Sequence, residues 1–275
     1  MTLPASPAPA EAPAGARLLT VGSLCSGIGG LELGLEMTGG FRTLWQAEID
    51  PYARAVLAKH WPRVQRLEDV RDVGRFTVSR VDLIAAGLPC QPHSIVGKRR
   101  SSDDARDLWG ECARIVGDLE PRWLLVENVP GLLSSRDPAY GHDFPGAYFG
   151  RILSDLDALG YDAEWQCLRA SDVGAPHRRE RLFLLAHPRR ERLQGVGPAG
   201  AGERAGGRVL PGRAPAGDGG AGGSGGGWQE PQPRIQRVAH GVPSRAHRIR
   251  TLGNAVVPQV ARWVGEHILA AERAA

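Results

Sequence analysis

The chain has 275 residues, a formal net charge of +4 and a hydrophobic content of 42%, values that are ordinary for a folded protein of one or one and a half domains. No run of 18 apolar residues occurs, which excludes a spanning helix, and the Ala/Pro-rich residues 1–16 do not resemble a signal peptide. The four cysteines form no CxxC pair, which argues against structural zinc and a disulfide scaffold. The mildly basic charge permits a nucleic-acid partner without requiring one.

Short apolar runs alternate with helical patterns along most of the chain. The predicted strands are 18–24, 43–47, 81–86, 123–126, 163–168 and 182–186. The predicted helices are 31–37, 51–60, 104–119, 147–159 and 254–271. The second helix opens on Asp50-Pro51, a capping residue followed by proline at the first helical position. This alternation predicts an α/β fold with a doubly wound, mostly parallel sheet and helices on both faces.

The domain boundaries follow from composition. Residues 195–227 contain 15 glycines and few large apolar side chains, which is typical of a flexible linker. We therefore expect a disordered tail at 1–16, a folded domain at 17–187, a short Gly-rich insert at 188–245 and a closing segment at 246–275 whose helix returns to the domain.

The first predicted strand ends in a glycine-rich turn that contains Gly27 and Gly29. Such a turn lets the backbone approach a ligand closely, and Glu48 follows at about the spacing of an acid that binds ribose hydroxyls. Glu32 stands where a nicotinamide-dinucleotide fingerprint requires a third glycine. The pattern favours another adenosine-bearing cofactor, although a simple tight connection would look the same.

Polar motifs adjoin three further apolar strands: two motifs follow a strand, and the third leads into the strand at 182–186. Cys90 lies between Pro89 and Pro92, and Glu127 follows the strand at 123–126. The carboxyl ends of parallel strands are where such sheets bind ligands. His177, Arg179 and Arg181 would share one face of an extended segment. Each motif alone also fits a structural reading, namely a buried thiol, a helix-capping acid and a solvated charge run.

As an ordered set, these motifs resemble the DNA (cytosine-5)-methyltransferase family over about residues 18–187 and 246–268. The resemblance implies a Rossmann-like fold that binds S-adenosyl-L-methionine, with residues 188–245 as a reduced, partly disordered target-recognition region. It implies the catalytic residues Cys90, Glu127, Arg179 and Arg181. It implies the cofactor-binding residues Ser26, Gly27, Ile28, Gly29, Gly30, Glu48, Ile49, Asp69, Val70, Gly87, Pro89, Leu108, Asn254 and Ala255. It implies the substrate-binding residues Pro89, Gln91, Ser94, Asn128, Val129 and His177, and no metal.

The same resemblance implies covalent catalysis. Carbon 5 of cytosine is a weak nucleophile, and attack of the Cys90 thiolate on carbon 6 would activate it. Glu127 would protonate ring nitrogen 3, Arg181 would hold the exocyclic oxygen, and Arg179 would order the nucleophile loop. The target base must leave the stack, so we expect it to be flipped. Cys25 stands where the family usually has a phenylalanine that packs on the adenine.

We therefore expect a monomeric cytoplasmic enzyme, of a bacterial cell or a phage-infected host, that acts on double-stranded DNA and not at a membrane. A cognate restriction endonuclease is a candidate partner. Methylation of RNA is an alternative with the same chemistry. A catalytically silent DNA-binding protein is disfavoured because all four catalytic residues are present, and a nicotinamide oxidoreductase is disfavoured by Glu32.

Overall fold

The protein is described by a computed structural model that covers residues 17–89, 107–137, 141–189 and 251–274. Its strands are β1 (Leu19–Leu24), β2 (Phe41–Ala47), β3 (Gln65–Leu67), β4 (Leu83–Gly87), β5 (Trp123–Asn128), β6 (Tyr161–Arg169) and β7 (Glu180–Pro188). Its α-helices are α1 (Gly30–Glu36), α2 (Pro51–His60), α3 (Trp109–Leu119), α4 (Ala147–Ala158) and α6 (Pro258–Ala274). Short 3₁₀ turns are η1 (Val70–Asp72), η3 (Pro130–Ser134) and η5 (Ala170–Val173).

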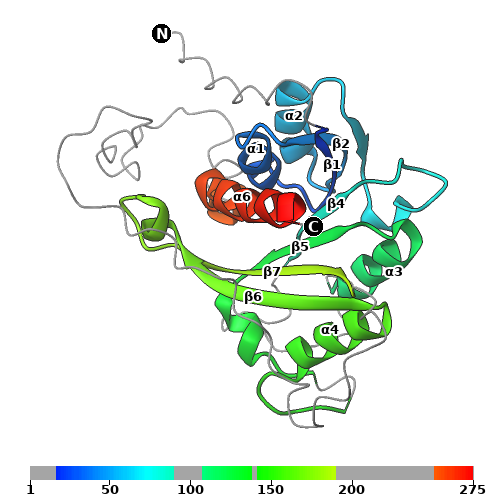
Figure 1. The fold of residues 1–275 in the computed structure, drawn as a ribbon, viewed down its shortest axis with the longest axis vertical. Coiled ribbons are helices and arrows are strands. Elements are labelled where there is room, and N and C mark those ends of the chain that lie inside the picture. The colour runs from blue at the N-terminus through cyan, green and yellow to red at the C-terminus, as the bar shows by residue number, and fades with distance from the viewer. Residues whose placement is uncertain (1–16, 90–106, 138–140, 190–250, 275) are drawn as a thin grey trace.

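The strands form one sheet in the order β3-β2-β1-β4-β5-β7-β6 (Figure 1). The pairs from β3 to β5 are all parallel, whereas β7 runs antiparallel to both β5 and β6. The predicted α/β fold with a mostly parallel sheet is confirmed. The short strand β3 and the reversed direction of β7 were not predicted.

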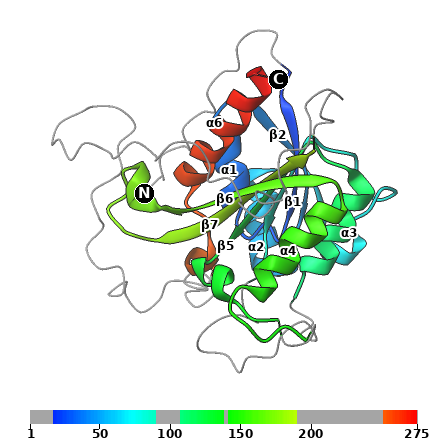
Figure 2. The same cartoon turned by 60° about the horizontal axis from the view of Figure 1, so that its bottom comes forward.

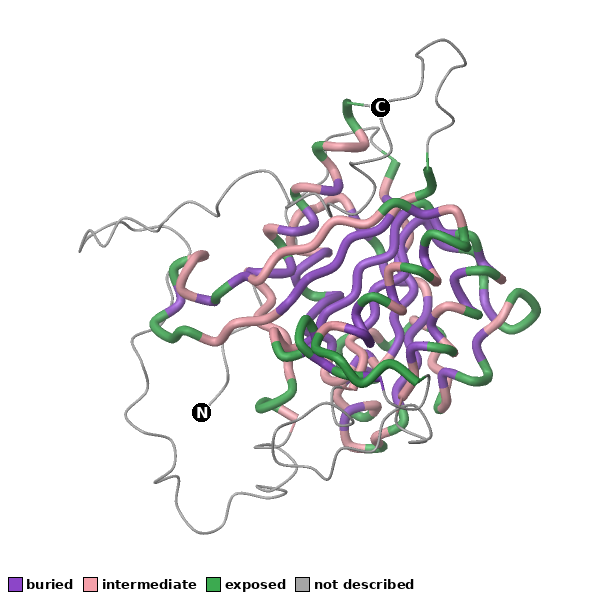
Figure 3. Tube along the Cα trace, turned by 90° about the horizontal axis from the view of Figure 1, so that it is seen from below, coloured by how far each residue is buried: buried purple, intermediate pink, exposed green. Residues whose placement is uncertain are grey.

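Helices cover both faces of the sheet, because alternate residues of the central strands point to opposite layers. Leu83 and Ala85 of β4 pack in the layer of α1 and α6, whereas Ile84 and Ala86 pack in the layer of α3 and α4. Figures 1 and 2 show these helix pairs on opposite sides of the sheet. Figure 3 shows the buried strands between them.

Two predicted helix starts were wrong, and both have a local cause. Helix α3 begins at Trp109, later than the predicted start at residue 104, and Leu108 is its N-cap. The carboxylate of Asp107 accepts a hydrogen bond from the N–H of Trp109 at 3.1 Å, which satisfies one of the free N–H groups of the first turn. The last helix, predicted from Asn254, begins at Pro258. Residues 251–254 form a separate helical turn, and residues 255–257 connect it to α6. Val257 is not helical, because proline disfavours a helical conformation of the residue before it. The predicted capping of α2 by Asp50 is confirmed.

Helix α6 reaches the sheet domain by packing directly on α1. Gly34 allows this approach, since a Cβ atom at this position would lie 2.2 Å from the carbonyl oxygen of Pro258 and 2.5 Å from the Cβ of Ala261. Val264 and Ile268 complete the buried face of α6. The packing brings residues 251–256 to the carboxyl edge of the sheet, far in sequence from the other residues there.

Candidate functional site

A cavity of about 460 Å³ opens at the carboxyl ends of the parallel strands β1, β2, β4 and β5. Thirteen of the predicted cofactor residues line it, and these are Ser26, Gly27, Ile28, Gly30, Glu48, Ile49, Asp69, Val70, Gly87, Pro89, Leu108, Asn254 and Ala255. Four other predicted site residues also line it, and these are Glu127, Asn128, Val129 and Arg181. The motifs that are scattered along the sequence therefore share one cavity.

Some predicted site residues do not line the cavity. Gly29 belongs to the glycine-rich turn but packs toward Trp61, since a Cβ atom there would lie 2.3 Å from its ring. His177 is exposed in a bend, and its Nδ1 accepts a hydrogen bond from the N–H of Arg179 at 3.3 Å. The regular strand begins only at Glu180, so the three predicted side chains do not form one extended face. Cys90, Gln91 and Ser94 lie outside the described residues.

Cavity-lining residues that the sequence analysis missed adjoin the predicted motifs in the chain. They are Leu31, Ala47, Asp50, Ala53, Glu68, Arg71, Leu88, Thr251 and Val256. Their signal in the sequence is only this adjacency, because single apolar and charged residues have no pattern that separates a cavity wall from a core or a surface.

Glu48 is a buried and hydrogen-bonded polar group at one end of the cavity. Its side chain is buried, and it follows directly after β2. Its Oε2 accepts a hydrogen bond from the N–H of Gly27 at 2.7 Å, and its Oε1 accepts one from the N–H of Asp50 at 2.8 Å. Gly27 has φ 56°, a left-handed conformation that glycine adopts without strain. The glycine-rich turn and the acid are thus held together as one unit.

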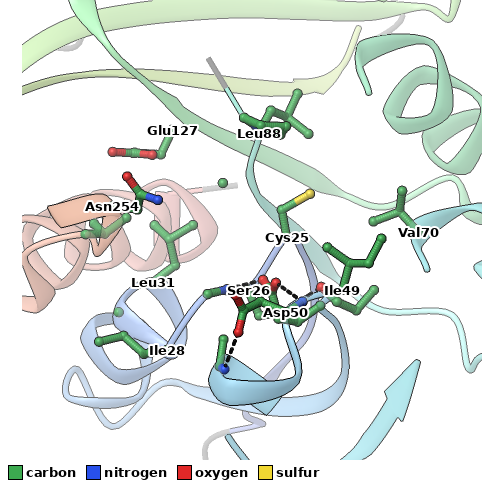
Figure 4. A pocket seen from close by; sticks show the side chains of 18 of the residues that line it. Cys25, Ser26, Ile28, Leu31, Ile49, Asp50, Val70, Leu88, Glu127 and Asn254 are labelled. Atoms are coloured by element: carbon green, nitrogen blue, oxygen red, sulfur yellow. Dashed lines mark hydrogen bonds between the residues drawn. The ribbon is translucent and has the colours of Figure 1, made fainter. Parts of the chain in front are cut away.

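Apolar and thiol groups surround this end of the cavity. Ile49 is 70% exposed although it is a large apolar residue. Burial, reinforced by the charges of Glu48 and Asp69, raises the pKa of the Cys25 thiol to about 12, so this thiol stays neutral. Cys25 also has φ 52°, an uncommon conformation for a residue with a side chain. Figure 4 shows its sulfur atom pointing into the cavity, beside Ile49 and Val70.

Asp69 lies at the entrance to this end. It caps η1, accepting a hydrogen bond from the N–H of Arg71 at 2.9 Å, and it pairs with the Arg71 guanidinium at 3.1 Å. The backbone hydrogen bond and the nearby cation lower the pKa of its carboxyl group. It is therefore a charged acceptor on the cavity wall.

Glu127 and Arg181 form an ion pair at the other end, on neighbouring antiparallel strands. Oε1 of Glu127 lies 3.0 Å from Nε of Arg181. Burial raises the pKa of Glu127 from 4.5 to about 7, and the charges of Arg181 and Arg179 oppose this rise without cancelling it. A carboxyl group with this pKa exchanges its proton readily at neutral pH. In Figure 4, Glu127 lies beside Asn254 and away from Ser26 and Asp50.

Arg179 connects this end of the cavity to the C-terminal segment. Its Nη1 donates a hydrogen bond to the carbonyl oxygen of Gly253 at 2.7 Å. Its Nε and Nη2 atoms are buried, with no hydrogen-bond partner among the described residues. Arg179 therefore carries two donors whose partners must come from elsewhere.

Asn128 joins the ends of two neighbouring strands. Its Nδ2 donates a hydrogen bond to the carbonyl oxygen of Leu88, after β4, at 3.3 Å. Its Oδ1 accepts one from the N–H of Val129 at 2.8 Å. These bonds fix the loop ends that follow β4 and β5.

A buried polar cluster supports the glycine-rich turn from behind. Glu32 of α1 is fully buried, and its Oε1 accepts a hydrogen bond from Nε2 of Gln46 at 3.4 Å. Burial raises the pKa of its carboxyl group, against hydrogen bonds to Ser23, Ser26 and Gln46. A fully buried carboxyl group in place of the third glycine of a dinucleotide fingerprint agrees with a different cofactor.

A second buried cluster fixes the wall around Leu108. The Asp107 carboxylate accepts a hydrogen bond from the Tyr148 hydroxyl and pairs with Nη2 of Arg151 at 2.9 Å. Nε of Arg151 lies 3.0 Å from a carboxylate oxygen of the fully buried Asp137. Arg151 of α4 thus holds the residue that precedes Leu108 in the chain.

Comparison with known proteins agrees with this geometry. A family model described as C-5 cytosine-specific DNA methylase matches residues 19–201. Type II methyltransferase M.NaeI of Lentzea aerocolonigenes is 39% identical over 172 residues, which are 61% of this chain and 40% of that protein. Type II methyltransferase M.NgoMIV of Neisseria gonorrhoeae is 36% identical over 164 residues, 59% of this chain and 50% of that protein.

Among solved structures, a prophage-encoded protein of E. coli described as a DNA modification methyltransferase is 30% identical, with a TM-score of 0.50, covering 62% of this chain and 47% of that one. The sheet and this neighbour define a Rossmann-like methyltransferase fold. The chain belongs to the C-5 cytosine-specific DNA methylase family, which confirms the resemblance found in its sequence.

The chain spans about half the length, or less, of the curated relatives named above. Within the described ranges, no helix is long and apolar enough to cross a membrane. Over those same residues, no group of three histidine, cysteine or acidic side chains could hold a metal ion.

Proposed function

We propose that the protein transfers a methyl group from S-adenosyl-L-methionine to carbon 5 of a flipped cytosine in double-stranded DNA. The observation that carries this proposal is the continuity of one cavity, with the Glu48 unit at one end and the Glu127–Arg181 pair at the other. A methyl donor and a nucleobase can therefore meet in it. Family membership supports the same chemistry.

The residues at the Glu48 end fit an adenosine group. Two backbone N–H groups orient the Glu48 carboxylate, and its remaining lone pairs are available to a pair of ribose hydroxyls. The exposed side chain of Ile49 offers an apolar surface to a planar ring, and Asp69 offers an acceptor to its amino group. When bound here, S-adenosylmethionine supplies an electrophilic sulfonium methyl group.

The residues at the other end fit a cytosine ring. Protonated Glu127 can donate a hydrogen bond to ring nitrogen 3, and Arg181 can donate to the exocyclic oxygen. The two donors of Arg179 that have no partner among the described residues are available to the chain segments that would contact the base.

Cys90, assigned as the nucleophile from the family resemblance, would add its thiolate to carbon 6 of the ring. This addition would convert the 5,6 double bond, with nitrogen 3 protonated, into a 4,5 enamine. Carbon 5 of the enamine would then attack the methyl carbon as the bond from methyl to sulfur breaks, and S-adenosylhomocysteine would leave. A base next removes the proton from carbon 5, and the Cys90 thiolate is expelled as the double bond re-forms. Glu127 supplies the proton to nitrogen 3 during addition and takes it back during elimination.

A fluorine atom at carbon 5 tests this sequence of steps, because the final elimination requires a proton there. Duplex DNA with 5-fluorocytosine at the target site, mapped first by bisulfite sequencing of DNA from an expressing cell, should form a denaturant-stable adduct with the enzyme and S-adenosylmethionine. The adduct should disappear in Cys90→Ala and persist in Cys167→Ala. Its absence with the wild-type enzyme, on DNA that the enzyme methylates, would contradict covalent catalysis. A transfer-RNA acceptor in parallel decides between DNA and RNA.

Three further assignments belong to this proposal. Residues 17–187 form the catalytic domain, 188–245 a reduced target-recognition region and 246–275 a segment that completes the cofactor site, with 1–16 as a tail. The enzyme works as a cytoplasmic monomer. Its relatives named as type II methyltransferases support a cognate restriction endonuclease as a companion.

A further inference from the structure

Arg54 of α2 binds the chain segment that forms the Glu48 end of the cavity. Its Nη1 donates hydrogen bonds to the carbonyl oxygens of Glu48 at 3.0 Å and Ile49 at 2.8 Å. Its Nη2 lies 3.2 Å from a carboxylate oxygen of Glu68. The three partners of this guanidinium all line the cavity, but Arg54 itself does not.

The position of Arg54 in its helix is not explained by helix stability. It lies in the first turn of α2, where the helix dipole disfavours a cation. The other basic residues of this helix, Lys59 and His60, lie in its last turn, where the dipole favours them. The contacts of Arg54 with the loop after β2 offset this local cost.

The hydrogen bonds from Arg54 hold the loop after β2 in its conformation. Burial of the loop's apolar side chains alone would not keep it there. Ile49 is 70% exposed, so a freely moving loop would gain free energy by turning this side chain inward. The bonds from Arg54 fix the carbonyl groups of the two peptide links that flank Ile49. Glu48 and Ile49 therefore stay in place before any ligand binds, and less ordering is left for the binding step.

We propose that Arg54 is a positioning residue for the adenosine end of the cofactor. It acts through Glu48, Ile49 and Glu68 without touching the cofactor itself. The inference rests on the proposed function, because it requires that S-adenosylmethionine binds in this cavity.

The test compares the full chain with Arg54→Met, which keeps length but removes the guanidinium, and Arg54→Lys, which keeps the charge but loses the fork of donors. Lys59→Met is the matched control, since it removes an exposed cation from the same helix. The dissociation constant of S-adenosylhomocysteine is measured by calorimetry. It should rise roughly tenfold in Arg54→Met and less in Arg54→Lys, and it should not change in Lys59→Met.

Kinetics separates positioning from a merely structural role. The KM for S-adenosylmethionine should rise with the dissociation constant, while kcat at saturating cofactor and the affinity for DNA without cofactor should stay within about twofold of wild type. A wild-type protein that binds no S-adenosylhomocysteine would overturn the proposed function. A wild-type protein that binds it, with both Arg54 variants binding equally well, would overturn the role of Arg54 alone. If Arg54→Met fails to fold, the comparison of the wild type with Arg54→Lys decides whether the guanidinium is needed.

Discussion

Glu127 shows how one environment can prepare a residue for proton transfer. Its strand buries it at the carboxyl edge of the sheet, and the removal of water outweighs the two nearby arginines. An ordinary glutamate at the surface would be fully ionised at neutral pH. Glu127 is protonated in about half of the molecules at its pKa of about 7, so it can both donate and accept a proton during one turnover.

The same pKa predicts a pH dependence of folding stability. A carboxyl group whose pKa rises from 4.5 in the unfolded chain to about 7 in the folded one favours the folded state most at low pH. This contribution is fully present below pH 4.5 and is lost as the pH rises through about 7. It amounts to roughly 3 kcal/mol, because one pKa unit corresponds to about 1.4 kcal/mol.

The measurement is denaturant unfolding of the wild type and of Glu127→Gln at pH values between 4.5 and 8. Glutamine keeps the shape but does not titrate, so the stability of the wild type relative to this variant should fall as the pH rises. A difference that is constant across this range would show that Glu127 titrates with an ordinary pKa.

At the scale of elements, the α1–α6 contact decides whether the cavity is complete. Residues 251–256 supply Thr251, Asn254, Ala255 and Val256 to its wall, and α6 holds them there. This contact depends on the absence of a side chain at Gly34, because backbone atoms of α6 occupy the space. A contact of this kind cannot relax by a rotamer change.

Gly34→Ala should therefore destabilise the protein by about 1–2 kcal/mol, since overpacking outweighs the gain in helix propensity. Binding of S-adenosylhomocysteine should weaken as α6 shifts away. Gly150→Ala is the control, because a Cβ atom at this exposed position of α4 meets no atom within 4 Å. It should stabilise the protein by about 0.5–1 kcal/mol. Denaturant unfolding of both variants checks the signs, and an equally tolerated Gly34→Ala would show that α6 is loosely packed.

At the scale of the whole molecule, the C-terminal helix belongs to the same core as the N-terminal strands. Val260, Ala261, Val264 and Ile268 are buried in the layer that also contains β1 and β4. At the end of α6, Glu272 accepts a hydrogen bond from the Trp123 indole at 2.8 Å and pairs with Arg122 at 2.7 Å. The sheet domain is therefore incomplete without this helix.

Two co-expressed pieces, residues 1–210 and 211–275, should consequently purify together and bind S-adenosylhomocysteine. Residues 1–210 alone should be poorly soluble. Each buried apolar side chain of α6 stabilises the folded protein by about 1.5–3 kcal/mol, and without α6 the apolar surface that it covers on the sheet domain is exposed to water. Co-purification with a tagged first piece and calorimetry test this expectation. Normal binding by residues 1–210 alone would show that the helix is dispensable.

The amino-acid sequence by itself determined the alternation of strands and helices, the α/β class and the family, because these depend on local periodicity and on short motifs. The cap of α2 at Asp50 and the acid Glu48 were predictable for the same reason. Periodicity does not encode strand direction or close helix contacts, so the reversed β7 and the Gly34 contact appeared only in the structure.

Only the tertiary structure could place charges in relation to one another. Arg54, Asp107 and Asp137 are ordinary charged residues in the sequence, and their roles depend on carbonyl groups and side chains brought to them by other elements. The same holds for His177, which a bend removes from the face that simple alternation predicted. Local sequence determines which elements form, whereas burial and electrostatic environment arise from contacts between residues that are distant in the chain.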